Sequence, residues 1–149
     1  MPLEHERHVL PCGTAVLARR LDVNDIVVVR AFAPMGALYE SDAEAGISSF
    51  VQSLLPRGTR RRSAHDIQEE LAGLGANVEG TAGLDLGSVN LRATRAGWEA
   101  AFDLWTEIIT EPSFPPEEVE TEIEQTLGAI EAREDQLSAR VVDLFRDLF

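Results

Sequence analysis

Cysteine and histidine, which commonly catalyse reactions or bind metals, are few in this sequence and poorly spaced for either task. The only thiol is Cys12, and the three histidines are His5, His8 and His65. His5 and His8 lie three residues apart in a segment with the pattern of a strand, where an odd offset places them on opposite faces. We therefore expect no metal site built from these histidines. A single cysteine also excludes an internal disulfide and a cysteine zinc knuckle.

Two glutamates of a predicted helix lie on the same face of that helix. Glu124 and Glu131 are seven residues apart, which is almost two helical turns, so they share one face of a helix. Each follows an isoleucine of an apolar stripe, Ile123 or Ile130, and stands at the edge of that stripe. Carboxylates in such positions are mostly solvated unless they are paired. The sequence has no serine-hydrolase elbow, phosphate-binding loop or dinucleotide fingerprint.

Length and charge limit the class of protein further. The 149 residues fit one domain, and 26 acidic against 13 basic residues leave a net charge of −13. This charge disfavours nucleic acids and anionic membranes as partners. No apolar run approaches the roughly 20 residues of a membrane span, and the charged N-terminal segment does not resemble a secretory signal, so we expect a cytoplasmic protein. The arginine cluster at 57–62 reads as a solvated loop.

The elements that must position these residues follow from hydrophobic periodicity. Strands are predicted at 8–10, 14–21, 26–32, 77–81 and 84–94. Helices are predicted at 42–54, 63–74, 97–110, 116–134 and 137–149. This order predicts an α+β fold with a mostly antiparallel sheet that contains Val16, Val28 and Val89 and carries its helices on one face. The β-branched run at 26–32 should be a central strand.

Apolar stripes predict which helix faces are buried. In the helix at 97–110 the inward residues should be Trp98, Phe102, Trp105, Ile108 and Ile109. In the helix at 116–134 they should be Val119, Ile123, Leu127 and Ile130.

The last predicted helix ends abruptly on two large apolar residues, Leu148 and Phe149. A helix that stops within its apolar stripe leaves a surface uncovered. We therefore expect the domain at 1–149 to be incomplete at its C-terminal end, and the isolated chain to associate with itself. The residues expected in that contact are the apolar side of the terminal helix: Leu144, Phe145, Leu148 and Phe149.

Six short landmarks occur along the chain in one order. They are Leu10-Pro11-Cys12-Gly13, Gly36-Ala37-Leu38-Tyr39-Glu40, Gly46-Ile47-Ser48-Ser49-Phe50, Pro56-Arg57-Gly58-Thr59, Gly73-Leu74-Gly75-Ala76 and Pro112-Ser113-Phe114-Pro115-Pro116-Glu117-Glu118. Together they resemble the N-terminal domain of the insulinase-like (pitrilysin, mitochondrial processing peptidase) metallopeptidases, family M16. The resemblance spans nearly the whole chain.

In active members of that family a helix carries His-x-x-Glu-His, because two histidines four residues apart present two nitrogens to one zinc and the glutamate polarises the bound water. Laid onto this motif, the chain has Ser49 and Ser53 at the histidine positions and Gln52 at the glutamate position. The resemblance also makes Glu131 the counterpart of the third zinc ligand, with Glu124 seven residues before it. Hydroxyls are poor zinc ligands and glutamine is no base. We expect no bound zinc, although active relatives contain it.

The resemblance implies a non-catalytic protein or subunit that forms a substrate chamber with a zinc-bearing homologue, or with its own missing domains, and that can contact a peptide substrate. Two alternatives stay open. One is an active zinc metalloendopeptidase, which the absent motif disfavours. The other is a purely structural relative.

Overall fold

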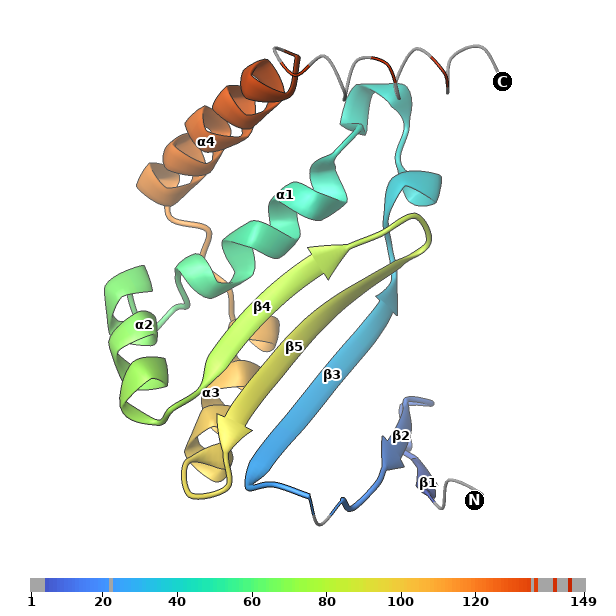
Figure 1. Cartoon of the computed structure of the whole chain (residues 1–149), viewed down its shortest axis with the longest axis vertical. Helices are drawn as coiled ribbons and strands as arrows, with labels where there is room; N and C mark the ends of the chain where they lie inside the picture. Colours follow the sequence, from blue (N-terminus) through green and yellow to red (C-terminus); the bar gives the residue numbers. More distant parts are fainter. Residues whose placement is uncertain (1–4, 22, 135, 137–140, 142–144, 146–149) are drawn as a thin grey trace.

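The computed structural model describes residues 5–21, 23–134, 136, 141 and 145. Its main sheet has three antiparallel strands in the order β3 (Ile26–Pro34), β5 (Leu86–Thr94) and β4 (Asn77–Ala82). The helices lie mainly to one side of this sheet (Figure 1). The predicted α+β class with an antiparallel sheet is thereby confirmed.

Two predictions about the strands are wrong. The middle strand is β5, whereas β3, predicted to be central, is an edge strand of the sheet that the described residues form. The first two strands, β1 (Glu6–Val9) and β2 (Ala15–Ala18), form a separate hairpin, so Val16 does not share a sheet with Val28 and Val89. The error has a physical cause, because β3 is apolar on both faces while one of those faces is open: Val28 is 52% exposed.

The described residues form four α-helices: α1 (Ile47–Leu54), α2 (Ala64–Gly73), α3 (Trp98–Thr110) and α4 (Pro116–Glu134). The first three pack against the sheet, and α4 packs against α1. Three short 3-10 turns lie at Ala37–Tyr39, Asp42–Glu44 and Leu55–Arg57. The core joins alternate residues of β4 and β5 to α2 and α3. Its fully buried large side chains are Ile67, Leu91, Leu104 and Ile108.

Two predicted helix faces need correction. In α3 the predicted Trp105 and Ile108 are buried, but the buried face continues through Ala101 and Leu104, and Phe102 lies at the surface at 36% exposure. In α4 the predicted inward residues Ile123, Leu127 and Ile130 are all exposed. An apolar stripe shows which face of a helix is suited to burial, but it does not supply the surface that covers it.

The arginine cluster is also more than a solvated loop. Arg62 pairs with Glu70 at 2.8 Å and with the buried carboxylate of Glu107, which also receives a hydrogen bond from Thr59 at 2.5 Å. Arg61 lies 3.1 Å from the same carboxylate. This network ties the segment before α2 to α3 through Glu107 and to α2 itself through Glu70.

Most of the predicted C-terminal helix lies outside the described residues. Leu144, Leu148 and Phe149 are among those outside, whereas Phe145 is described and is 61% exposed. Within the described part of the chain, no helix has the length and apolar character that crossing a bilayer requires.

Candidate functional site

Helix α1, which carries the three motif positions, is fixed at its start by a carboxylate from the preceding turn. Glu40 accepts hydrogen bonds from the backbone N–H of Gly46 at 2.7 Å and of Ser48 at 2.9 Å. Gly46 is the N-cap, at a φ of 93°, and brings no capping side chain of its own. The N–H of Gly46 is the main cause that lowers the pKa of Glu40, followed by Ser48. Glu40 therefore does the work of a helix cap from six residues upstream.

The three motif positions have different surroundings. Ser49 is exposed, and its carbonyl accepts a hydrogen bond from the hydroxyl of Ser53 at 3.1 Å. Gln52 is only 4% exposed, and its Nε2 donates to Sδ of Met35 at 2.9 Å. Its Oε1 is buried and has no hydrogen-bond partner within the described part of the chain. Gln52 is thus built into the core, while the two serines stay near the surface.

Two strand glycines make room for this arrangement. A Cβ at Gly80 of β4 would collide with the backbone and side-chain oxygens of Gln52. A Cβ at Gly87 of β5 would collide with the thioether of Met35. From the sequence alone, a glycine inside a strand only lowers the expected stability of that strand. It can equally mark a position where another segment approaches the backbone closely. Here α1 approaches Gly80, and Met35, which follows β3, approaches Gly87.

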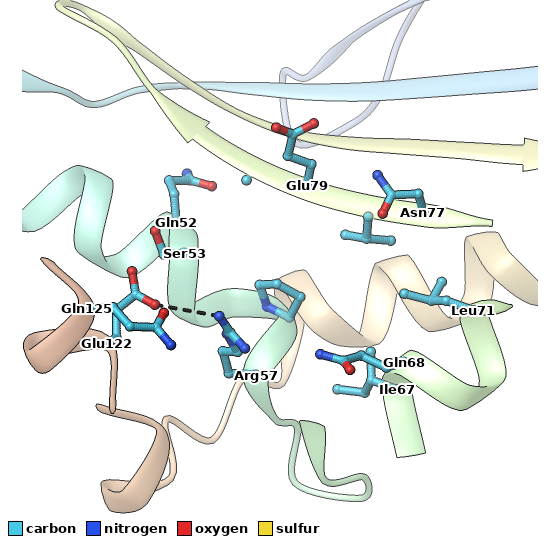
Figure 2. Close-up of a pocket in the computed structure, with 13 residues that line it drawn as sticks. Gln52, Ser53, Arg57, Ile67, Gln68, Leu71, Asn77, Glu79, Glu122 and Gln125 are labelled. Atoms are coloured by element: carbon cyan, nitrogen blue, oxygen red, sulfur yellow. Dashed lines mark ion pairs between the residues drawn. The ribbon is translucent and has the colours of Figure 1, made fainter. Parts of the chain in front are cut away.

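A cavity of about 500 Å³ lies beside Gln52 and Ser53. Its sides come from the end of α1, from α2, from the outer edge of β4 and from α4, as Figure 2 shows. Arg57 and Glu122 form an ion pair across it, with 3.7 Å between Nη2 and Oε2. The other polar side chains that border it are Gln68, Asn77, Glu79 and Gln125. This lining offers amide donors and acceptors over an apolar floor of Ile67, Leu71 and Val78.

The predicted carboxylates do not border the cavity. Glu124 and Glu131 are exposed residues of α4, and the helix presents Glu122 and Gln125 to the cavity instead. Gln125 follows Glu124 by one residue and Glu122 precedes it by two, which rotates them away from Glu124 by about 100° and about 200° around a helix of 3.6 residues per turn. Sequence spacing identified the helix but not the face that the packing would select.

The donor set does not fit a zinc ion. A catalytic zinc site needs three nitrogen, sulfur or carboxylate ligands. The hydroxyl of Ser53 is already donated to a helix carbonyl, and Gln52 donates to a thioether. No three His, Cys, Asp or Glu side chains converge anywhere in the described part of the chain.

Sequence reasoning missed Met35 and Arg57 as parts of the site. Nothing in the local pattern marks Met35, which contacts Gln52 from 17 residues away. Arg57 could have been found, because it follows a Pro56 that ends the helix next to the motif positions, but it was assigned to solvent with the other arginines.

The fold and the site together define an α+β domain in which helix α1, with Ser49, Gln52 and Ser53, packs against strand β4. The model of the insulinase family, peptidase family M16, matches residues 15–147. The chain belongs to this family.

Individual relatives are distant. An uncharacterized zinc protease of Rickettsia felis is 26% identical over 133 residues, which are 89% of this chain and 32% of that protein. Its counterpart in Rickettsia bellii is 24% identical over the same shares. The mitochondrial cytochrome b-c1 complex subunit 1 of Caenorhabditis elegans is 23% identical over 100 residues, or 67% of this chain and 21% of that subunit.

Solved structures show the same fold. A peptidase M16 inactive domain from Pseudomonas fluorescens superposes with a TM-score of 0.83 at 22% identity, covering 90% of this chain and 33% of that one. A protease from Helicobacter pylori gives 0.79 at 17% identity, with shares of 90% and 32%. The chain therefore spans about a third of the length of the curated relatives and solved structures that it matches most fully.

Proposed function

We propose that this chain is the N-terminal domain of a non-catalytic member of the M16 family, which binds peptide and helps form a substrate chamber with a zinc-bearing homologue. The observation that carries the proposal is Gln52. It stands at the position of the catalytic glutamate, 4% exposed and bonded to Met35. A neutral amide has no proton-accepting group near neutral pH, so Gln52 cannot act as the general base.

The outer edge of β4 supports a peptide-binding role. Gly83 donates to the carbonyl of Leu86 at 2.9 Å, so in this register odd-numbered residues of β4 exchange hydrogen bonds with β5. The backbone groups of Val78 and Gly80 point the other way, along the cavity. An extended peptide can pair with a free strand edge through its main chain, while neighbouring pockets select its side chains.

The cavity suits such a peptide chemically. The amides of Gln68, Asn77 and Gln125 can both donate to and accept from a peptide backbone. The buried Oε1 of Gln52 is an acceptor still without a donor in the described part of the chain. Arg57 and Glu122 neutralise each other, whereas Glu79 adds a negative charge to the lining, so the cavity disfavours a carboxylate of the peptide.

Two neighbouring residues of α4 give a matched test of peptide binding. Gln125 borders the cavity and Glu124 does not. With a mixture of unstructured peptides as ligand, Gln125→Ala should weaken binding about fivefold, as expected for one lost hydrogen bond. Glu124→Ala should leave the affinity unchanged. Equal effects of the two variants would contradict a binding site in the cavity.

A separate experiment tests the partnership. A zinc-bearing homologue with an intact His-x-x-Glu-His motif, encoded in the same genome, should cleave peptides with a higher kcat/KM when this protein is added. The homologue should also co-purify with it. If neither result is obtained, the proposed partnership is wrong. Chelator-sensitive cleavage of peptides by this chain alone would instead support the alternative of an active zinc metalloendopeptidase.

A structural role is the second candidate. The similarity to cytochrome b-c1 complex subunit 1 favours it, because the name of that protein describes a subunit of a larger complex. Stable incorporation into a complex without any peptide binding would support this role over the first.

A further inference from the structure

The segment that follows α1 crosses the linker between α3 and α4 at Gly58. The N–H of Ser113 donates to the carbonyl of Gly58 at 3.1 Å, and the N–H of Arg60 donates to the carbonyl of Glu111 at 3.1 Å. A Cβ at Gly58 would lie 2.8 Å from Cγ of Pro115 and 2.9 Å from Oγ of Ser113. The two segments therefore meet at a distance that requires a glycine at position 58.

The linker adopts an unfavourable backbone conformation at this crossing. Phe114 has a φ of 48° and is the only non-glycine residue with a positive φ in the part of the chain that the structure describes. A left-handed conformation is rare for a bulky residue, and the residue before a proline such as Pro115 normally adopts an extended one. A conformation of this kind persists only where the surrounding contacts fix the backbone.

The Gly58 side of the crossing is held more firmly than the linker. Leu55, three residues earlier, belongs to the buried core. Thr59 is 5% exposed, and its hydroxyl donates to the buried carboxylate of Glu107. The linker residues at 113–114, in contrast, are exposed. Bulk added at Gly58 should therefore displace the linker and leave the end of α1 in place.

The linker also determines where α4 begins. The carbonyl of Pro115 accepts two backbone hydrogen bonds from the first turn of α4, each at 3.0 Å. Further along the helix, Glu122 and Gln125 border the cavity (Figure 2). Glu122 pairs there with Arg57, the neighbour of Gly58 in the sequence. The same two segments are thus joined twice, once at the crossing and once at the cavity.

We propose that Gly58 is a positioning residue of the peptide site, because its close contact with Pro115 sets the distance between α4 and α1 at which Gln125 borders the cavity. This inference rests on the proposed function, since it explains how one wall of that site is placed. Gly58 does not itself border the cavity. Its effect on peptide binding must therefore pass through α4.

A pair of substitutions tests this route. Gly58→Ala should weaken peptide binding about fivefold, as much as the loss of the Gln125 hydrogen bond, because the start of α4 must move away from the added methyl group. In the Gly58→Ala background, Gln125→Ala should then add less than about a twofold loss, since the amide no longer reaches the peptide. Gly73→Ala, at a position of α2 with open space around it, is the matched control and should leave the affinity unchanged.

A compensating variant separates positioning from a general loss of stability. Pro115→Ala removes the ring atoms that the added Cβ would meet, so Gly58→Ala combined with Pro115→Ala should bind peptide within about twofold of the parent chain. Ser113→Val crowds the crossing from its exposed side and should also weaken binding, which keeps the test open if Gly58→Ala does not fold. Thermal melts followed by circular dichroism establish which variants are folded.

The placement of α4 can also be measured without peptide. In amide NMR spectra of the free chain, Gly58→Ala should shift the signals of α4 as far as Gln125, whereas Gly73→Ala should not. Additive losses from Gly58→Ala and Gln125→Ala, no rescue by Pro115→Ala, or shifts confined to the crossing itself would each overturn the proposal. A parent chain that binds no peptide would instead refute the proposed function, and the amide spectra would then decide the placement of α4 by themselves.

Discussion

The hydroxyl of Thr59 donates to Oε1 of Glu107 over 2.5 Å, joining two residues that are 48 positions apart in the sequence. Glu107 is 5% exposed and also pairs with Arg62. Burial by itself would raise the pKa of Glu107, but the hydrogen bonds from Thr59 and Arg62 and the arginine charges outweigh it, and the pKa is lowered. The carboxylate is thus buried in its charged form, with its partners already in place.

Removing this charge should destabilise the fold. Glu107→Gln leaves Arg62 without its buried counter-charge, and because Arg62 remains about one-third exposed the cost should be about 2 kcal/mol in the free energy of unfolding. Urea denaturation at neutral pH measures it. Glu111→Gln, which removes a more exposed partner of Arg61 at 3.4 Å, should cost less than half as much. Equal losses of unfolding free energy in the two variants would contradict the conclusion that Glu107 is the main carboxylate of this network.

Acid should weaken the fold through the same group. A carboxyl whose folded pKa lies below its ordinary value of 4.5 stabilises the fold above that value and loses its contribution as pH falls toward the folded pKa. Stability of the parent chain should therefore drop below about pH 4.5, and Glu107→Gln should show a shallower drop. Denaturation series at several acidic pH values provide the comparison, and parallel curves for the two proteins would exclude Glu107 as a cause.

Glu40 should control the start of α1. Glu40→Gln keeps the size of the side chain but removes the charge that accepts from Gly46 and Ser48. We expect a lower Tm and faster amide exchange at the N-terminal turn of α1, with little change in α3. Hydrogen exchange resolved by peptide measures this difference, and Glu44→Gln, in the neighbouring turn, is the control. Uniform loss of protection would indicate a global effect instead.

Gln52→Glu should destabilise the chain near neutral pH. A carboxylate at this position would be buried beside the Met35 thioether, so its pKa should rise and its charged form should cost about 2 kcal/mol. Because the folded pKa is raised, the loss should be present at high pH and disappear as pH falls below the ordinary glutamate value. Gln52→Met, which needs no ionisation, should be tolerated at both pH values. A pH-independent loss would refute the burial of the side chain.

The two kinds of glycine should respond to alanine with opposite signs. Gly80→Ala forces a Cβ into Gln52, with a cost of about 2 kcal/mol, since the neighbouring atoms include backbone. Gly128→Ala lies inside α4 with open space around it and should stabilise by about 0.5 to 1 kcal/mol. Thermal unfolding of both variants is the measurement. Destabilisation of similar size in both would show that strand and helix glycines do not differ as described.

Metal analysis tests the remaining chemical prediction. Protein purified without a histidine tag should retain well under one zinc ion per chain after dialysis, because Ser49, Ser53 and Glu131 offer too few good ligands. Stoichiometric zinc would contradict this and would demand ligands from elsewhere.

The sequence was sufficient for the order of elements, because Ile67, Leu91 and Ile108 follow the periods of buried helices and strands. It could not show which strand is central and which lies at an edge, since the apolar residues of β3 form the same pattern whether or not a neighbouring strand covers them. The resemblance to the family motif pointed to Gln52 and Ser53, which border the cavity, and to Ser49, which does not. The rest of the site was not predictable, because Met35 and Glu122 come to the cavity region only through tertiary packing.

The contact between Gln52 and Met35 also bears on how such a domain evolves. A codon for glutamine is one base from a codon for glutamate, so that step by itself is always within reach of mutation. In this background, however, the new carboxylate would be buried against the thioether of Met35. A glutamate at position 52 would be accommodated better if Met35 changed as well. The packing that holds the amide thereby disfavours that one-base step.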